Sequence, residues 1–353
     1  MLQLYLYYNI TNYSNARVHL SQEVVDYDPA SDNIMITNKI KGCFYGYAIG
    51  DALGIGTEFM TRREVRMRYP DGLHDYSQII RDAHRSIWKR GQVSHDTEVV
   101  MMMARSFVEC GHPDHMDYAS RLKNWFDTTI PSDLTANLRW ILRRSDFAKR
   151  PLEVSQEAYE QQGLHEPYNE ALGRAMVAGL WPGDPERHVL NFTKITHWDQ
   201  LAVACAMVVG VMANELLWHR READPDRLAG VIRRFDRRLL PYMEVARNGK
   251  LSDFELDDED TLWSAPKTVG SAMWLLWHIS DPSEALEVII AEGGDADTNA
   301  ALALGLMGLK YGYSRLPARL IEGLLDASRV EECTQRLVPV LKEAGDRLYD
   351  DVF

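Results

Sequence analysis

The chain has 353 residues, of which 46% are hydrophobic and 26% charged, a composition typical of a soluble globular protein rather than a disordered one. Its formal net charge of -13 repels phosphate backbones, which argues against nucleic-acid binding and suits a protein that holds cations. The four cysteines stand far apart without a C-x-x-C pair, which indicates neither a zinc cluster nor a disulfide framework and predicts a cytoplasmic location.

The first 37 residues differ from the rest of the sequence. The stretches LYLYYNI and ARVHL are rich in Tyr, Val and Ile, which favour extended structure over helix. Because the segment lacks a basic start and a small-residue cleavage site, it does not resemble a signal peptide. We therefore expect an extended or β arm over residues 1–37 and a single domain over residues 38–353, because no linker interrupts the remainder.

From Lys39 onward the hydrophobic residues follow helical spacing. Val99, Met102 and Met103 recur at i, i+3 and i+4, for example, and turn signals separate such segments. The longest apolar run, 201–213, is shorter than the roughly 20 residues that cross a bilayer. The pattern predicts an all-α bundle without a membrane span.

The segment GYAIGDALGIGTE, residues 46–58, places small residues every four positions and ends in a glycine-rich exit. Such spacing permits close helix packing, and Glu58 follows where the backbone can approach a ligand. The alternative is a helix that ends in a glycine cap before a surface glutamate.

The segment VSHDTE, residues 93–98, leads directly into an apolar helix. Ser94 followed by acidic residues is typical of a helix N-cap, which by itself accounts for these residue types. The functional alternative is that a hydroxyl, an imidazole and a carboxylate, from Ser94, His95 and Asp96, project together as ligands for Mg²⁺ or Mn²⁺.

The segment EGGDADTN, residues 292–299, opens another apolar helix. Asp295, Asp297 and Thr298 can chelate a hard cation with little backbone between them, and the two preceding glycines permit a tight approach. The alternative is again a helix cap. Two neighbouring carboxylates, however, repel each other unless a cation or hydrogen-bond donors lie between them.

Together, the three segments resemble the ADP-ribosylglycohydrolase family, from about Lys41 to about Gly312. The resemblance consists of G-D-A-L-G with a Glu seven residues after its Asp, an S/T-D-D-T-like turn, and G-G-D-x-D-T before a small-residue helix. It implies an orthogonal helical bundle with a Mg²⁺ or Mn²⁺ site, of two ions, at the helix starts. It also implies metal-dependent hydrolysis of the N- or O-glycosidic bond of ADP-ribosylated side chains, with arginine favoured.

The resemblance assigns roles to individual residues. Metal ions would chelate the ribose hydroxyls and orient a water, while carboxylates move protons and stabilise oxocarbenium-like charge. The implied catalytic residues are Glu58, Asp96 and Asp297, with Glu58 gating the site or transferring a proton. The implied metal ligands are Ser94, His95, Asp96, Asp295, Asp297 and Thr298, and the implied substrate-binding residues are Asn169, Gly173, His197, Gly293 and Gly294.

The sequence departs from the family pattern at two places. His95 stands where the family usually has an Asp, and a neutral, softer imidazole favours Mn²⁺ or a single ion and predicts weaker activity. In YNEALGR, residues 168–174, which resembles an N-G-x-x-M-R stretch near the ligand's phosphates, Glu170 replaces a Gly and Gly173 a Met. A carboxylate that faced a pyrophosphate would be unfavourable, so Glu170 must turn away if ADP-ribose binds there.

The expected partner is an ADP-ribosylated protein substrate. The alternative function is that of an immunity protein, which would occlude an ADP-ribosyltransferase toxin with the arm 1–37, with or without hydrolase activity. The arm could equally cover the surface of its own domain. For His197, which follows Thr196 at a helix start, a local hydrogen bond is the alternative to a role in the substrate cleft.

Overall fold

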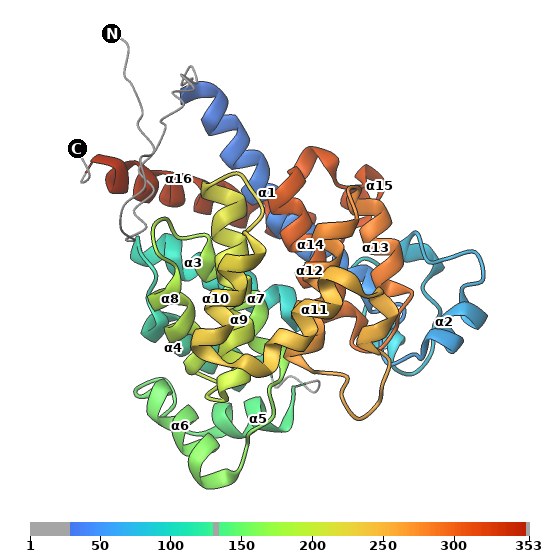
Figure 1. The fold of residues 1–353 in the computed structure, drawn as a ribbon, viewed down its shortest axis with the longest axis horizontal. Helices are drawn as coiled ribbons and strands as arrows, with labels where there is room; N and C mark the ends of the chain where they lie inside the picture. Colours follow the sequence, from blue (N-terminus) through green and yellow to red (C-terminus); the bar gives the residue numbers. More distant parts are fainter. Residues whose placement is uncertain (1–28, 130–133, 351–353) are drawn as a thin grey trace.

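The computed structural model describes residues 29–129 and 134–350, which form sixteen α-helices joined by turns and short 3-10 segments (Figure 1). No β-strand occurs in these two ranges; Tyr168 and Ser264 form an isolated bridge. The prediction of an all-α fold is confirmed. The helices are α1 (Pro29–Gly54), α2 (Arg62–Arg68), α3 (His95–Cys110), α4 (His115–Thr129), α5 (Ala136–Arg143), α6 (Pro151–Gln162), α7 (Leu172–Gly179), α8 (Glu186–Lys194), α9 (Gln200–Trp218), α10 (Pro225–Phe235), α11 (Leu240–Asn248), α12 (Ala265–His278), α13 (Pro282–Ile290), α14 (Ala296–Tyr311), α15 (Ala318–Gly323) and α16 (Ala327–Asp350).

Helix α1 begins at Pro29, so residues 29–37, which we expected to be extended, are helical. Proline is well tolerated in the first turn of a helix, where its missing N–H has no intrahelical partner. Ile36 packs against the hydrophobic core, and this tertiary contact outweighs the preference of β-branched residues for strands. The rest of the predicted arm, residues 1–28, lies outside the described residues.

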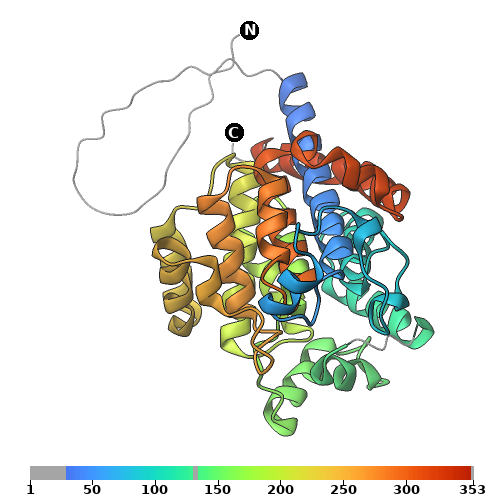
Figure 2. The same ribbon diagram turned by 90° about the vertical axis from the view of Figure 1, so that its right-hand side faces the viewer.

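The second half of α1 packs against α14, and the two helices run in opposite directions, while the first turns of α1 project beyond this contact (Figures 1 and 2). Four glycines spaced four residues apart on α1 line this contact. At Gly50 a Cβ would lie 2.3 Å from the carbonyl oxygen of Ala300, and at Gly54 a Cβ would lie 2.4 Å from the Cα of Asp297. No side chain fits at these distances. The close packing therefore brings the end of α1 directly against the first turn of α14.

Helix α9 is a long, deeply buried helix of the bundle. Every residue from Leu201 to Leu217 is buried, and the helix is longer than the apolar run seen in the sequence. Within the described parts of the chain it is the one helix long and apolar enough to cross a membrane, but 94% of its apolar window is buried inside the protein. Its apolar sequence is therefore accounted for by the core.

Lys39 in α1 binds the C-terminal ends of α9 and α14. Its Nζ donates hydrogen bonds to the carbonyl oxygens of Leu216 in α9, at 3.0 Å, and Leu309 in α14, at 2.6 Å. These carbonyls belong to the last turns, which have no intrahelical donor and carry the negative end of the helix dipole. Burial lowers the pKa of Lys39 to about 8. The lysine thus fixes the C-terminal ends of α9 and α14 to α1.

Candidate metal-binding active site

The loop after α1 pairs with the loop before α14. The N–H of Phe59 donates to the carbonyl of Gly294 at 2.7 Å, and the N–H of Gly294 donates to the carbonyl of Met60 at 2.9 Å. Gly293 and Gly294 both have φ of +69°, and a Cβ on Gly293 would lie 2.0 Å from the Met60 carbonyl oxygen. Both glycines are therefore required by backbone contacts, which explains their presence without the predicted substrate-binding role.

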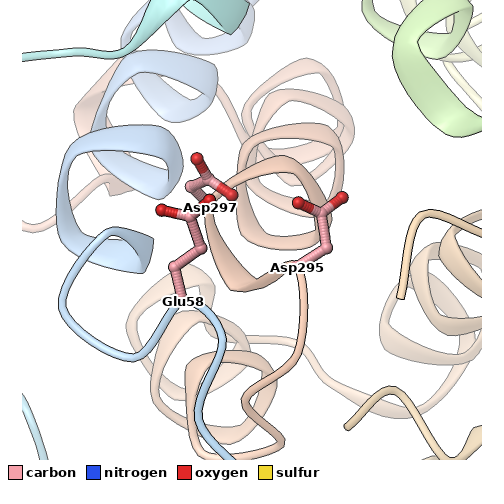
Figure 3. Close-up of side chains that lie close together, drawn as sticks. All are labelled: Glu58, Asp295 and Asp297. Carbon is pink, nitrogen blue, oxygen red and sulfur yellow. The ribbon is translucent and has the colours of Figure 1, made fainter. Parts of the chain in front are cut away.

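This pairing brings three carboxylates together. Each of Glu58, Asp295 and Asp297 is buried and offers an oxygen within 4.8 Å of the others. Figure 3 shows Glu58 rising from the loop after α1 toward Asp297 in the first turn of α14, with Asp295 on the loop just before that helix. Buried like charges so close together are unfavourable without protons or a cation. The cluster therefore has the donor chemistry of a hard-cation site.

Protonation in the metal-free protein reflects this crowding. Burial, followed by the charge of Asp96, raises the pKa of Asp295 to about 8. Burial, followed by the charge of Glu58, raises the pKa of Asp297 well above its ordinary value. Without a cation, these carboxyl groups therefore retain protons to a higher pH than exposed aspartates do.

The two acidic loops that the sequence singled out meet in space. The hydroxyl of Thr298, at the start of α14, donates to Oδ2 of Asp96, at the start of α3, at 2.7 Å. Ser94 caps α3 and its Oγ accepts from the N–H of Asp96 at 3.1 Å. The N-cap reading of this segment is thus correct. It coexists with an arrangement that brings Asp96 beside the carboxylates of the other loop.

Asp51 also belongs to the site, although the sequence did not predict a role for it. It is completely buried in α1, and its carboxylate accepts hydrogen bonds from the N–H of Ser94 at 3.0 Å, the N–H of Thr97 at 3.2 Å and the hydroxyl of Thr97. Burial, then the charge of Asp96, raises its pKa to about 7. Asp51 therefore attaches the start of α3 to α1. Its place in G-D-A-L-G was noticed, but that motif alone does not reveal this partner.

His95 lies at the edge of the cluster. Its Nε2 is 3.4 Å from Oδ1 of Asp96, and its ring stacks on Trp125 with centroids 6.4 Å apart and planes 18° apart. Trp125 in turn donates from Nε1 to Glu98 at 3.2 Å. His95 is thus held beside Asp96 by an aromatic contact from α4. It does not belong to the compact group formed by Glu58 and the two aspartates of the α14 loop.

His84 is a second residue that the sequence reasoning missed. Its Nε2 lies 2.7 Å from Oε2 of Glu58. Arg85, next in sequence, is buried and donates to the carbonyl oxygen of Glu58. Both residues lie in the irregular segment between α2 and α3, where no periodic pattern marks a residue as facing the site.

Asn169 holds Asp295 in place. Its Nδ2 donates to Oδ2 of Asp295 at 2.6 Å and to the hydroxyl of Thr268 at 3.0 Å, and that hydroxyl donates to Oδ1 of Asn299 at 2.7 Å. Both amide protons of Asn169 are used in these two bonds. The structure therefore gives the Asn169 amide a supporting role beneath Asp295, where the sequence predicted contact with substrate.

Gly173 and its neighbour Arg174 lie in the core. A Cβ on Gly173 would lie 2.4 Å from the hydroxyl oxygen of Tyr47 and 2.8 Å from Val100. Arg174 is fully buried in α7 and bonds to the carbonyl oxygens of Phe192 and Glu170. Gly173 thus has a packing role between α1 and α3, and its substrate-binding role stays a prediction.

Glu170 and His197 lie close together near the start of α7. The carboxylate of Glu170 accepts from the N–H of Thr135 at 3.1 Å and its hydroxyl at 2.7 Å, so it turns toward the start of α5. His197 bonds through Nδ1 to Thr196 at 2.8 Å. Its buried Nε2 lies 3.8 Å from Glu170 and has no hydrogen-bond partner within the described structure. Burial lowers the pKa of His197 to about 3, so the ring is neutral.

Two exposed aromatic side chains border the acidic cluster. Phe59, at φ of +59°, is 47% exposed and Trp263 is 39% exposed, and their ring centroids lie 6.3 Å apart. Phe59 follows Glu58 directly. The carbonyl of Trp263 accepts from the N–H of Asn169 at 2.9 Å. The same backbone segments that hold the carboxylates therefore place an aromatic rim beside them.

Comparisons with known proteins agree on one relationship. A profile of the ADP-ribosylglycohydrolase family matches residues 32–347. ADP-ribosyl-(dinitrogen reductase) glycohydrolase from Rhodospirillum rubrum is 28% identical over 88% of this chain and 98% of its own. ADP-ribosylarginine hydrolase Tri1 from Pseudomonas putida is 24% identical over 88% of this chain and 82% of its own. A solved structure described as an ADP-ribosylglycohydrolase-related protein complex superposes with a TM-score of 0.69 and 23% identity, over 87% of this chain and 99% of that one.

Proposed function

Because this chain belongs to the ADP-ribosylglycohydrolase family, we propose that it hydrolyses the glycosidic bond between ADP-ribose and a protein side chain, with arginine as the favoured side chain. The observation that carries the proposal is the buried group of Glu58, Asp295 and Asp297, within 4.8 Å of one another and beside the bond from Thr298 to Asp96. The names of the bacterial relatives support the substrate class, and one of them specifies arginine.

The donor set fits a hard divalent cation. Carboxylate and hydroxyl oxygens are the ligands that Mg²⁺ and Mn²⁺ prefer, and burial, followed by the charges of neighbouring carboxylates, raises the pKa values of Asp295 and Asp297. We propose two ions, held by Asp295, Asp297 and Thr298 together with Asp96 and Ser94, while His95 stands beside Asp96. A bound ion would supply Lewis acidity and orient the ribose hydroxyls and a water.

The residues of the chain supply the remaining chemistry. Hydrolysis forms a bond between a water oxygen and the anomeric carbon and breaks the bond to the side-chain nitrogen. A carboxylate takes the proton from the water, and the departing guanidine gains one. Asp297 and Glu58 are suited to this proton transfer because they lie side by side (Figure 3). Asn169 and Thr298 orient the aspartates through hydrogen bonds, which limits the reorganisation needed during the reaction.

Release of ADP-ribose tests the proposal directly. Purified protein with Mg²⁺ or Mn²⁺ is incubated with one peptide sequence that carries ADP-ribose on arginine or on serine, and free ADP-ribose is measured by chromatography. We expect release from the arginine peptide, none after chelation, and two bound ions per chain by metal analysis. Failure to release ADP-ribose from either peptide would refute the hydrolase. Faster release from serine would refute the arginine preference alone.

The immunity-protein alternative has no support among the described residues. It depends on the segment 1–37, of which the structure describes only residues 29–37, and these are already part of α1. The relatives named above include no toxin-binding protein by their descriptions. We retain the cytoplasmic location as part of the proposal, since Cys43, Cys205 and Cys333 are buried free thiols, which suit a reducing compartment.

A further inference from the structure

Glu58 occupies a position that its own loop does not secure. The carboxylate lies beside those of Asp295 and Asp297, so electrostatic repulsion favours its movement out of the site. The loop that carries it runs from the end of α1 through Phe59, whose φ of +59° is unusual for a residue with a side chain. Contacts from elsewhere in the chain must therefore keep the carboxylate in place.

Arg85 holds the backbone of this loop. Its guanidinium is buried and donates from Nε to the carbonyl oxygen of Gly56 at 2.8 Å and from Nη2 to that of Glu58 at 2.5 Å. Asp82 orients the arginine, accepting from its N–H at 2.8 Å and from Nη1 at 2.6 Å. One planar cation thus binds the loop on both sides of Thr57, in a geometry that lysine cannot reproduce.

His84 holds the side chain. Its Nε2 lies 2.7 Å from Oε2 of Glu58, and because a carboxylate only accepts hydrogen bonds, Nε2 is the donor. The imidazole contacts two aromatic rings, with centroid distances of 5.0 Å to Phe59 and 5.1 Å to Trp88. These rings restrict its rotation, so the donor nitrogen is aimed at Glu58 before any ligand binds.

We propose that His84 and Arg85 form a clamp that positions Glu58, with His84 holding the carboxylate and Arg85 the backbone. This inference rests on the proposed function in so far as Glu58 borders the proposed cation site, within 4.8 Å of Asp295 and Asp297. The clamp acts through Glu58, so both are positioning residues rather than catalytic ones. Groups that orient metal-site carboxylates commonly change metal affinity or activity 10- to 100-fold when they are removed.

The molecule contains a matched control. His74 Nδ1 lies 2.9 Å from Oε1 of Glu287, the same kind of pair, but both side chains are about half exposed and Glu287 is outside the acidic group. His84→Ala removes the donor to Glu58. His84→Gln keeps an N–H donor at a similar reach, and His74→Ala removes the control pair. Thermal unfolding of all three variants shows whether the fold is intact.

Mn²⁺ affinity, measured by electron paramagnetic resonance titration, is the readout that does not depend on turnover. We expect His84→Ala to weaken Mn²⁺ binding about tenfold, His84→Gln to remain within about threefold of wild type, and His74→Ala to show no change. In hydrolysis assays His84→Ala should lower kcat and leave KM for the ADP-ribosylated peptide nearly unchanged, because the clamp orients a site carboxylate without touching the substrate.

Several results would overturn the clamp. These are wild-type Mn²⁺ affinity in His84→Ala, an equal loss in His74→Ala, no rescue by His84→Gln, or a wild type that binds no Mn²⁺. Failure of the proposed function gives a different pattern. A wild type that binds Mn²⁺ but releases no ADP-ribose refutes the hydrolase, while the comparison of His84 and His74 variants still decides the clamp.

Discussion

Two buried groups of carboxylates in this protein are stabilised in opposite ways. Glu215 in α9 is completely buried and forms ion pairs with Arg221, at 2.8 Å, and Arg227. Asp295 and Asp297 are buried to a similar degree, but their hydrogen-bond partners within the described residues are uncharged, namely the Asn169 amide and the N–H of Thr298. Protein cations neutralise the first group, and the second is left for an external cation.

The largest expected effect comes from removing one charge at the acidic site. Asp297→Asn should lower kcat/KM for an arginine-ADP-ribosylated peptide by roughly 10³, or about 4 kcal/mol of transition-state stabilisation. It should also weaken Mn²⁺ binding in a titration. Glu287→Gln, which changes an exposed carboxylate, serves as the control and should leave both values unchanged. Retained activity in Asp297→Asn would remove the distinction between the two groups.

Stabilisation by the cation should depend on pH in a specific direction. On folding, burial raises the pKa of Asp51 from 3.8 to about 7 and that of Asp295 to about 8. Because these acids bind protons more tightly in the folded protein than in the unfolded chain, protonation stabilises the fold. This stabilisation is complete below the unfolded pKa of 3.8 and is lost as pH rises through the folded pKa values of about 7 to 8. A cation competes with these protons, so it should stabilise more at high pH than at low pH.

Thermal unfolding with and without Mn²⁺ at pH 5 and pH 8 checks this expectation. At a free concentration of about 100 times Kd, the ion should add about 2.7 kcal/mol at pH 8 and much less at pH 5. Glu215→Gln, whose site is already neutralised by arginines, should show the same Mn²⁺ response as wild type. Equal stabilisation at both pH values would contradict the protonation of the acidic group.

Neutralising Glu215 should have the opposite effect on the metal-free fold from neutralising Asp297. Glu215→Gln removes the partner of two arginines and should lower the free energy of unfolding by about 2 kcal/mol. Asp297→Asn removes a repulsion and should leave the metal-free protein at least as stable as wild type. Denaturant unfolding in the presence of a chelator measures both. A lower free energy of unfolding in Asp297→Asn would show that repulsion between the carboxylates does not dominate the stability of the metal-free site.

The smallest effect is expected at Glu170, whose carboxylate turns to Thr135. Glu170→Gln removes the charge and keeps an acceptor, so kcat/KM should change less than about threefold and stability by about 0.5–1 kcal/mol. Hydrolysis kinetics and denaturant unfolding measure these two quantities, and calorimetric titration measures the affinity for ADP-ribose, which should stay near that of wild type. Tenfold tighter binding would show instead that the carboxylate faces the pyrophosphate and that the sequence-based concern about this residue was justified.

The sequence predicted the acidic site better than its surroundings. Ser94, Asp96, Asp295 and Thr298 could be found because each stands at a helix start, where spacing to the following apolar residues is visible. The glycine pair Gly293 and Gly294 predicted a close approach, and the structure shows that the backbone of Met60 makes it at Gly293, while their substrate-binding role stays a prediction. The family resemblance is confirmed by the match over residues 32–347.

The remaining site residues depend on long-range packing. Asp51 meets Ser94 across 43 positions and His84 meets Glu58 across 26. Neither contact follows a helical period, and His84 lies between α2 and α3 in a segment whose regular structure is limited to two short 3-10 turns. The start of α1 was missed for a related reason. The stretches LYLYYNI and ARVHL predicted extended structure for the whole segment 1–37, whereas residues 29–37 are helical and Ile36 packs against the core.

The glycine spacing on α1 has a consequence for which changes the chain tolerates. The contact with α14 fixes the register of the two helices, because Gly54 packs against the backbone of Asp297 and Gly50 against that of Ala300. A slip by one glycine step would displace the helices by about 6 Å and part Glu58 from Asp297. A one-residue insertion within 42–54 would turn bulky side chains toward α14. The spacing of the glycines across this stretch should therefore distinguish active family members from inactive ones as reliably as the presence of the carboxylates does.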